Sequence, residues 1–407
     1  MKIGLIDAEI LVNRKKRFPN LAIMKLSSFF KSQGHDTQLI LNYDDLYLYD
    51  QIYLSCVFSK TRSLLHEPLL QKHRVICGGT GFYYDKYDDA PHLTQDQEHA
   101  MPDYSIYDEW IKYRLSDEEK EENLKYFTDF SIGFLTRGCF RKCSFCVNRN
   151  SKRSALHSPV SEFLADDGKR NLLSMLDDNV LALGQHDLPS LMRLLNELIQ
   201  ITTDRKSRFE FKQGMDLRLM NQEYAKLFAQ ARYNGDFIFA FDNLKEQKQI
   251  EKGLTIFRNE VQKDSIKAYV FCGFPEPVLD DIVSAFQRIK ILWKYHALAY
   301  IMRHDKYLQA KPPYKNIYVQ LGRWCNQPRF QKKMTFRVFC NKSGGIASDN
   351  MRQFQDLHPS VSDKFFDIAY PGSPYAGPSP LVDEWSQKDF TGEVDESFAR
   401  IHGDITF

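Results

Sequence analysis

Residues 136–146 read TRGCFRKCSFC, and Cys139, Cys143 and Cys146 stand there in the spacing C-x3-C-x2-C. Iron–sulfur clusters are held by cysteine thiolates, so three thiolates in one loop can hold three corners of a cubane cluster. No fourth cysteine stands nearby. One iron of such a cluster would therefore be open to a small-molecule ligand.

The main alternatives for this motif are a zinc site and a disulfide framework. Structural zinc normally takes four ligands from two paired half-sites of the C-x2-C kind. The remaining cysteines are scattered singly and form no second pair: Cys56, Cys77, Cys272, Cys325 and Cys340. The missing second half-site favours an iron–sulfur cluster, and it also leaves no ligand set for an auxiliary cluster.

At this motif the chain resembles the radical S-adenosylmethionine (radical SAM) enzymes. Phe145 matches the family form C-x3-C-x-aromatic-C, and the lead-in at residues 136–138 matches as well. The resemblance implies a [4Fe-4S] cluster on the three cysteines, S-adenosylmethionine (SAM) chelated by the open iron, and Phe145 near the adenine. It further implies a one-electron reductant, such as a flavodoxin- or ferredoxin-like protein, and cleavage of SAM to a 5′-deoxyadenosyl radical.

Composition agrees with a cytoplasmic enzyme. The chain has 407 residues, a formal net charge of +2 and 43% hydrophobic residues, as in ordinary globular proteins. No stretch approaches the roughly 18 consecutive apolar residues of a membrane span, so we expect no membrane partner. Residues 1–7 read as a buried strand and not as a signal peptide. Unpaired cysteines are typical of a reducing compartment.

The pattern of strands and helices predicts an α/β protein, in which a partial (β/α)6 radical SAM barrel follows a small Rossmann-like parallel-sheet domain. We expect five segments: a Rossmann-like, cobalamin-binding-like domain over 1–100, a linker over 101–129, the barrel over 130–303, a basic segment over 304–342, and an acidic tail containing Pro and Gly over 343–407.

In the first segment, strands are predicted at 2–7, 37–41, 51–57 and 74–77, with a helix at 20–32. The last strand runs into a glycine cluster at 78–81, which is not a G-x-G-x-x-G dinucleotide fingerprint. This segment resembles the cobalamin-binding-like domains of radical SAM proteins because it precedes the predicted barrel, as those domains do. Their D-x-H-x-x-G motif is absent, because Asp7 is followed by Ala8-Glu9-Ile10. This absence favours a domain used for packing or substrate docking over one that binds cobalamin.

The predicted barrel has six strands, at 131–136, 173–176, 209–212, 237–241, 268–272 and 297–301, separated by helices. The cysteine loop leaves the first of these strands at its C-terminal end, where β/α barrels place reactive groups. In the linker before the barrel, the charge run 117–122 predicts a solvated helix.

Asp177, Asp178 and Asn179 follow the second barrel strand. The resemblance places here the G-G-E-like segment that holds the amino group of SAM, with the glycines replaced by acids. A carboxylate that faces an ammonium group makes a strong, charge-assisted hydrogen bond. The alternative role is a helix N-cap, which Asp and Asn favour.

Gln213, Asp216 and Arg218 follow the third strand and resemble a Q-G-x-D-x-R stretch of radical SAM proteins. The resemblance implies contact with the ribose hydroxyls or the carboxylate of SAM. Arg218 could instead pair with Asp216 or Asp178 as a structural brace.

The later strand ends carry fewer signals. Gly273 lies in a stretch that resembles the G-x-I-x-G-x-x-E region, where close approach to the adenine is implied. Cys272 reads as a small buried residue. Asp242 could lie near ribose or substrate, or form a turn, and His304 could exchange a proton or belong to a polar loop. No catalytic residue is assigned.

Charge is uneven after the barrel. Residues 302–342 hold ten Lys/Arg and one Asp, a net of +9, whereas 343–407 hold four Lys/Arg and eleven Asp/Glu, a net of −7. Aromatic residues stand among the basic ones, a mixture that can bind phosphates and stack bases. Helical spacing of apolar residues favours the alternative, a solvated helix face over an apolar core.

Three functions remain open at the level of sequence. The first is a radical SAM enzyme that abstracts hydrogen from an unidentified substrate, for which a nucleic acid and a peptide are the candidates. The second is a cobalamin-dependent radical SAM methyltransferase of a small molecule. The third is a non-catalytic iron–sulfur sensor or binding protein, which would hold a cluster without releasing 5′-deoxyadenosine.

Overall fold

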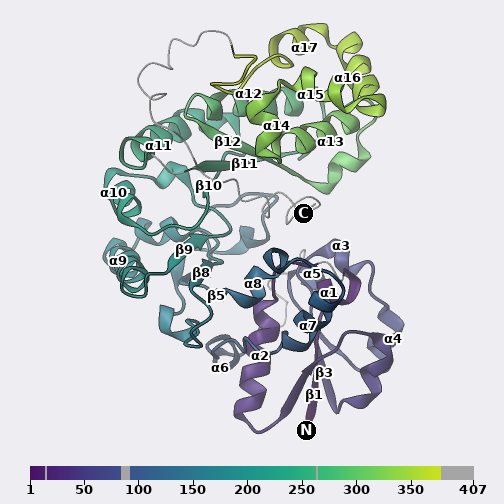
Figure 1. Cartoon of the computed structure of the whole chain (residues 1–407), viewed down its shortest axis with the longest axis vertical. Helices are drawn as coiled ribbons and strands as arrows, with labels where there is room; N and C mark the ends of the chain where they lie inside the picture. The colour runs from purple at the N-terminus through teal and green to yellow at the C-terminus, as the bar shows by residue number, and fades with distance from the viewer. Residues whose placement is uncertain (14–15, 84–91, 263–264, 377–407) are drawn as a thin grey trace. The chain divides into compact units, whose positions relative to one another are not determined.

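The computed structural model describes residues 1–13, 16–83, 92–262 and 265–376 (Figure 1). The chain divides into two compact units, Met1–Gln213 and Gly214–Phe407. The first unit holds the N-terminal domain and the first three barrel strands. The second unit holds the last three barrel strands and the C-terminal helices.

The N-terminal domain is built on a four-stranded parallel sheet in the order β2-β1-β3-β4. Its strands are β1 (Lys2–Asp7), β2 (Asp36–Leu39), β3 (Gln51–Ser55) and β4 (Ile76–Gly78). Parallel sheets are buried on both faces, and β1 shows this directly. Its Ile3 and Leu5 pack with α2 (Leu21–Ser32), whereas Ile6 packs in a second core on the opposite face. The predicted Rossmann-like domain is confirmed.

Short helices complete this domain: α1 (Ala8–Val12), η1 (Tyr43–Leu48), α3 (Ser59–Arg62), α4 (Glu67–Lys72), α5 (Thr80–Tyr83) and α6 (Gln95–Glu98). The glycine cluster at 78–81 packs against the turn that follows β3. Gly79 has a φ of +94°, and a Cβ there would lie 2.3 Å from the carbonyl oxygen of Cys56. These glycines therefore allow the β3–α3 and β4–α5 turns to touch.

The predicted linker over 101–129 is wrong as a linker, because it belongs to the N-terminal core. It contains α7 (Asp108–Ser116), η3 (Glu121–Asn123) and α8 (Lys125–Thr128). Tyr107, Trp110 and Phe127 pack with α2 and are almost fully buried. The charge run at 117–122 is largely exposed as expected, but it forms no helix beyond the short η3 and Glu118 has a φ of +60°. It has no apolar side to bury, and packing of an apolar face supplies most helical stability in proteins.

The first half of the barrel is a three-stranded parallel sheet in the order β5-β8-β9. Its strands are β5 (Phe130–Gly133), β8 (Leu172–Met175) and β9 (Arg208–Phe211), and α9 (Leu188–Asp204) packs on β9. A short antiparallel ribbon of β6 (Thr136–Arg137) and β7 (Ala155–Leu156) flanks the cysteine loop. Single turns complete this part of the chain: η4 (Val147–Asn150), η5 (Val160–Glu162) and η6 (Val180–Gln185).

The second unit begins with another three-stranded parallel sheet, in the order β10-β11-β12. Its strands are β10 (Phe237–Ala240), β11 (Ile266–Cys272) and β12 (Ala297–Arg303). The intervening elements are η7 (Leu217–Leu219), α10 (Gln222–Gln230), η8 (Leu244–Glu246), α11 (Gln247–Glu260) and α12 (Leu279–Trp293). All six predicted strands of the barrel are thus present, three in each unit.

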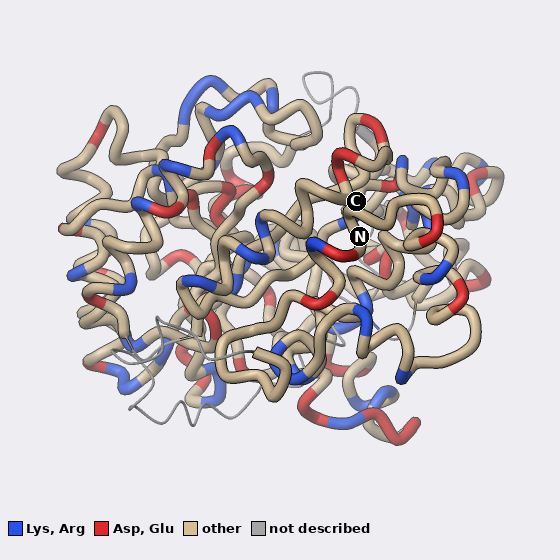
Figure 2. The backbone as a smooth tube through the Cα atoms, turned by 90° about the horizontal axis from the view of Figure 1, so that it is seen from above, with Lys and Arg blue, Asp and Glu red and all other residues tan. Residues whose placement is uncertain are grey.

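The segment after the barrel is helical and folded. It comprises η9 (Asp305–Gln309), α13 (Tyr314–Cys325), α14 (Pro328–Lys333), α15 (Phe336–Ser343), α16 (Gly345–Leu357) and α17 (Pro359–Phe365). Tyr318, Trp324 and Phe336 have 0% exposure, so they form a core and are not available to stack on bases. Figure 2 marks the Lys and Arg positions of the described backbone in blue and the Asp and Glu positions in red. The first part of the segment predicted as an acidic tail forms α16 and α17, where Met351, Phe354 and Phe365 bury an apolar face. Residues 377–407 lie outside the described chain.

Within the described ranges, no helix combines the length and apolar character that crossing a membrane requires.

Candidate iron–sulfur site

The cysteine loop leaves β6 through a glycine that no other residue could replace without strain. Gly138 has a φ of +89°, and a Cβ there would lie 2.5 Å from the carbonyl oxygen of Arg153 and 2.6 Å from Oγ of Ser151. The Ser151 hydroxyl also accepts a hydrogen bond from the backbone N–H of Cys139 at 3.2 Å. The residues that follow the loop therefore close its base.

The sulfur atoms lie in a setting that fits a cluster. All three cysteines and Phe145 are half-buried. Backbone N–H groups point at two sulfurs, from Arg141 to Sγ of Cys139 and from Asn148 to Sγ of Cys146, each at 3.4 Å. Hydrogen bonds to ligand sulfurs are one of the features that tune iron–sulfur clusters. These residues supply three thiol donors and N–H groups directed at them.

The described residues contain no group of three His, Cys, Asp or Glu side chains that could hold a single metal ion. A cubane cluster makes no such demand, because each thiolate binds a different iron atom. Three cysteine thiols are the donor chemistry that iron–sulfur clusters take.

Asp177 and Asp178 lie at the carboxyl end of β8 and turn toward the cysteine loop. Asp177 is 1% exposed. It accepts hydrogen bonds from the N–H of Leu135 at 3.2 Å, and from the N–H and hydroxyl of Thr136 at 2.6 and 2.7 Å. Burial raises the pKa of Asp177 to about 7, although these donors oppose the rise. Asp178 accepts from the N–H of Gly138 at 2.7 Å.

Asn179 extends this segment to the first cysteine. Its side-chain Nδ2 donates to Sγ of Cys139 at 3.5 Å. Asn179 also precedes η6, but its side chain makes no capping hydrogen bond there. The N-cap alternative is therefore not how this side chain is used.

The Q-G-x-D-x-R residues do not all belong to one unit. Gln213 is exposed and ends the first unit, whereas Asp216 and Arg218 lie in the second. Arg218 pairs with Asp216 in two parallel contacts, Nε to Oδ1 at 2.6 Å and Nη2 to Oδ2 at 2.9 Å, and it also pairs with Glu246. Burial would lower the pKa of Arg218, but these two carboxylates raise it. These contacts correspond to the structural brace that the sequence left open for Arg218.

The later strand ends are likewise tightly bonded. Gly273 has a φ of +80°, and its N–H donates to Asp281 at 2.6 Å. Cys272 is fully buried, and burial raises the pKa of its thiol. Burial also raises the pKa of Asp242, to about 6, and lowers that of His304.

Three residues that support the cysteine loop or the later strand ends were not singled out from the sequence. Asn148 and Ser151 follow the last cysteine and bond to the loop or its supports, as polar residues beside a metal motif often do. Arg288, 1% exposed, donates to the carbonyl oxygens of Phe241 and Phe271 at the ends of β10 and β11. An arginine within the apolar pattern of α12 was a usable signal, because a charged residue is almost never fully buried unless it is paired.

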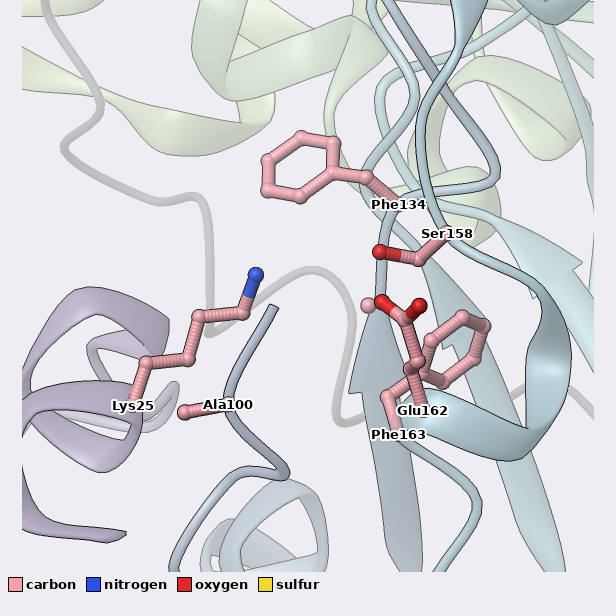
Figure 3. Close-up of a pocket in the computed structure, with 7 residues that line it drawn as sticks. Lys25, Ala100, Phe134, Ser158, Glu162 and Phe163 are labelled. Carbon is pink, nitrogen blue, oxygen red and sulfur yellow. The ribbon is translucent and has the colours of Figure 1, made fainter. Parts of the chain in front are cut away.

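A small hollow beside Phe134 at the end of β5 is lined by Lys25 from α2 and by Ser158 and Glu162 (Figure 3). Lys25 lies 3.5 Å from the carboxylate of Glu98. The remaining charged groups are paired as well, His157 with Glu98 at 3.1 Å and His99 with Glu162 at 2.8 Å. The hollow therefore lies within a network of charged pairs that joins α2 and α6 to the segment from β7 to η5.

The carboxyl edge of the N-terminal sheet carries a second buried charge network. Lys16 lies 2.8 Å from the carboxylate of Asp7 and 3.6 Å from that of Glu9. The Tyr107 hydroxyl donates to Asp7 at 2.9 Å, and Glu9 accepts from the N–H of Val57 at 2.9 Å. Burial raises the pKa of Glu9, and Lys16 opposes that rise. The turn after β1 contains no histidine, so its residues do not fit the D-x-H-x-x-G mode of holding cobalt.

Comparison with solved structures identifies the fold. The chain is similar to the radical S-adenosylmethionine methyltransferase TsrM from Kitasatospora setae, whose structure contains cobalamin and a [4Fe-4S] cluster. The TM-score is 0.50 at 11% sequence identity, over 78% of this chain and 74% of that chain. A second match is the cobalamin-dependent SAM radical enzyme OxsB with aqua-cobalamin and SAM bound, with a TM-score of 0.46 at 12% identity, over 88% of this chain and 61% of that chain.

No protein-family model matches the sequence, and no curated protein matches it either. The likeness to TsrM confirms the predicted fold, a radical SAM barrel together with a Rossmann-like domain. That solved structure contains cobalamin, whereas the sequence of this chain favours a domain used for packing or substrate docking.

Proposed function

We propose that this protein is a radical SAM enzyme that binds a [4Fe-4S] cluster through Cys139, Cys143 and Cys146 and cleaves SAM reductively. One observation carries the proposal. The C-x3-C-x2-C loop follows the carboxyl end of the first barrel strand in a fold similar to a radical SAM methyltransferase, and N–H groups point at two of its sulfurs.

The residues of the chain divide the work of such a reaction. The three thiolates would hold the cluster, and the half-buried Phe145 would contact the adenine of SAM. When bound, the cluster supplies the electron that splits SAM into methionine and a 5′-deoxyadenosyl radical. The protein positions the reactants and excludes water, as enzymes with reactive cofactors do. A flavodoxin- or ferredoxin-like protein is the proposed electron donor.

The test is an anaerobic assay for 5′-deoxyadenosine. Protein reconstituted with iron and sulfide is mixed with dithionite and SAM, and the product is measured by mass spectrometry. Release of 5′-deoxyadenosine that requires both the reconstituted cluster and dithionite supports the proposal. A loaded cluster that neither binds nor cleaves SAM contradicts it and favours the iron–sulfur sensor.

The substrate proposed from sequence is a macromolecule, either a peptide or a nucleic acid. Burial of Tyr318 and Trp324 removes one argument for the nucleic acid, because these rings cannot stack on bases. Incubation with peptide and RNA pools, followed by mass spectrometry for a modified product, separates the two.

Cobalamin-dependent methyl transfer is the second candidate, and the fold likeness to TsrM favours it. The chemistry at the sheet edge weighs against a histidine-ligated cobalamin, because Asp7 and Glu9 are paired with Lys16 there. Gel filtration with hydroxocobalamin, followed by visible absorption of the protein peak, decides between a bound and an excluded cofactor. Stoichiometric cobalamin in that peak would support the second candidate, and its absence would contradict it.

A further inference from the structure

We infer that Asp178 is a positioning residue that ties the two ends of the cysteine loop together and sets its conformation for cluster binding. This inference rests on the proposed function of the loop. It assigns to Asp178 a task that differs from the contact with the SAM amino group that the family resemblance implies.

The two oxygens of Asp178 reach opposite ends of the loop. Oδ2 accepts a hydrogen bond from the N–H of Gly138, the residue immediately before Cys139, at 2.7 Å. Oδ1 accepts from Nδ2 of Asn148, which stands two residues after Cys146, at 2.6 Å. One carboxylate therefore bridges the entrance and the exit of the segment that contains all three cysteines.

The backbone segment that contains Asp178 is held in place by its neighbours. Its neighbour Asp177 is buried and bonded to the backbone of Leu135 and to Thr136 in the strand segment that leads into the loop. Arg137 places its Nε 3.9 Å from Asp178 and partly balances the charge. Hydrogen bonds from N–H groups to a carboxylate are stronger than those between neutral groups. The bridge is thus anchored at β8, at the strand before the loop, and at both loop ends.

Asp177 and Asp178 therefore both bond to the loop or to the strand before it, and Asn179 bonds to the loop as well. Asn179 sends its Nδ2 to the sulfur of Cys139. Its Oδ1 is buried and has no hydrogen-bond partner. The segment 177–179 thus supports the strand end, the loop ends and one cluster ligand in turn, and groups that orient metal ligands typically change metal affinity by about 10–100-fold when they are removed.

An exchange of the two partners tests this inference. Asn148→Asp places a carboxylate against that of Asp178, and like charges at contact distance repel. Asp178→Asn alone should be milder, because Asn148 can turn its amide so that its oxygen faces the new amide nitrogen. The double variant Asn148→Asp/Asp178→Asn restores a donor opposite an acceptor, and the amide oxygen introduced at position 178 can still accept from the N–H of Gly138. Rescue of this kind measures the coupling between the pair directly.

The readouts are iron and sulfide content after anaerobic reconstitution, the rate of iron loss to a chelator, and the EPR spectrum of the reduced cluster. We expect Asn148→Asp to lose iron about 10–100-fold faster than wild type and the double variant to return most of the way. Wild-type retention in Asn148→Asp overturns the inference, and so does a double variant that loses iron as fast as Asn148→Asp.

A folding defect and a failure of the proposed function are each distinguishable from these outcomes. If Asn148→Asp does not fold, as judged by circular dichroism, Asn148→Ala removes one arm of the bridge without adding charge. Iron loss from that variant at the wild-type rate overturns the inference. The readouts do not depend on SAM, so a wild-type protein that holds a cluster but neither binds nor cleaves SAM contradicts the proposed function alone.

Discussion

The first unit contains two carboxyl edges of parallel sheets, and their acidic residues have different main partners. At the N-terminal sheet, Asp7 and Glu9 face the ammonium group of Lys16. At the barrel sheet, Asp177 and Asp178 face backbone N–H groups and side-chain amide or hydroxyl groups of the cysteine loop. The first edge ends in a closed ion-pair network, whereas the second holds a loop whose three thiols remain half-buried.

The difference teaches how one kind of sheet edge can either be closed by a side chain or carry a loop with free space for the proposed cluster. A buried carboxylate needs compensation at either edge, because burying an unpaired charge is costly. At the first edge a lysine provides it with a long side chain that occupies the edge. A loop provides it with its own backbone, and this leaves the loop's side chains available for a cluster.

Loss of one cysteine should break the functional edge completely. Cys143→Ala removes one of the three proposed cluster ligands, so we expect loss of the iron–sulfur absorption and of 5′-deoxyadenosine formation. The matched control is Cys77→Ala, at a half-buried thiol of the N-terminal domain, which should keep both. Full activity of Cys143→Ala would refute the assignment.

Loss of Lys16 should destabilise the carboxyl edge of the N-terminal sheet. Lys16→Met leaves Asp7 and Glu9 without their cation, and removing one partner of a buried ion pair costs about 3–5 kcal/mol. We expect urea unfolding to show that loss in free energy, and Lys31→Met, at a more exposed lysine, to cost about 1 kcal/mol or less. Equal effects of the two variants would show that the Lys16 network adds nothing beyond a surface pair.

The glycine at the entrance to the cysteine loop offers a sharper test of loop geometry. Gly138→Ala introduces a Cβ at positive φ and within 2.5 Å of a carbonyl oxygen, whereas Gly168→Ala has positive φ but no atom within 4 Å. The control should cost about 1–2 kcal/mol of backbone strain. We expect a larger fall in melting temperature for Gly138→Ala, together with loss of iron content that the control does not show.

Acid should weaken the network of charged pairs around the hollow, and it should do so only at a pH well below neutral. Burial would raise the pKa of Glu98, but His157, Lys25 and Arg137 outweigh it and lower the pKa to about 2. Because the folded pKa lies below the unfolded value, this stability is present above about pH 4.5 and is lost as the pH falls through about 2. It amounts to at most about 3 kcal/mol. Glu98→Gln should flatten the pH dependence of unfolding in that window, and an unchanged profile would contradict the assignment.

The smallest effect is expected at Asn179. Asn179→Ala removes the hydrogen bond to Sγ of Cys139. Such bonds stabilise the more negative, reduced cluster, so the midpoint potential should shift to a more negative value. Protein-film voltammetry measures this shift, and Ser144→Ala in the exposed part of the loop serves as the control. A potential equal to that of the wild type would show that this contact has no influence on the cluster.

The sequence predicted the barrel well because its signals are local. Apolar runs fixed the six strands to within a few residues, and cysteine spacing located the loop. The use of Asp178 was not predictable in this way, because its partners Gly138 and Asn148 lie 40 and 30 residues away in the chain. The linker was mispredicted for the same reason. Tyr107 and Trp110 read as isolated aromatics until α2 supplies the surface on which they pack.

That packing has a consequence for how the chain can be divided into fragments. A fragment that ends near residue 100 would keep the whole N-terminal sheet but would lack the aromatic residues that cover α2. Its apolar face would be open to water and prone to association. A fragment that continues through α8, to about residue 129, includes that cover. The smallest fragment that keeps the cover of α2 therefore ends at the start of β5, although the compact unit itself continues to Gln213.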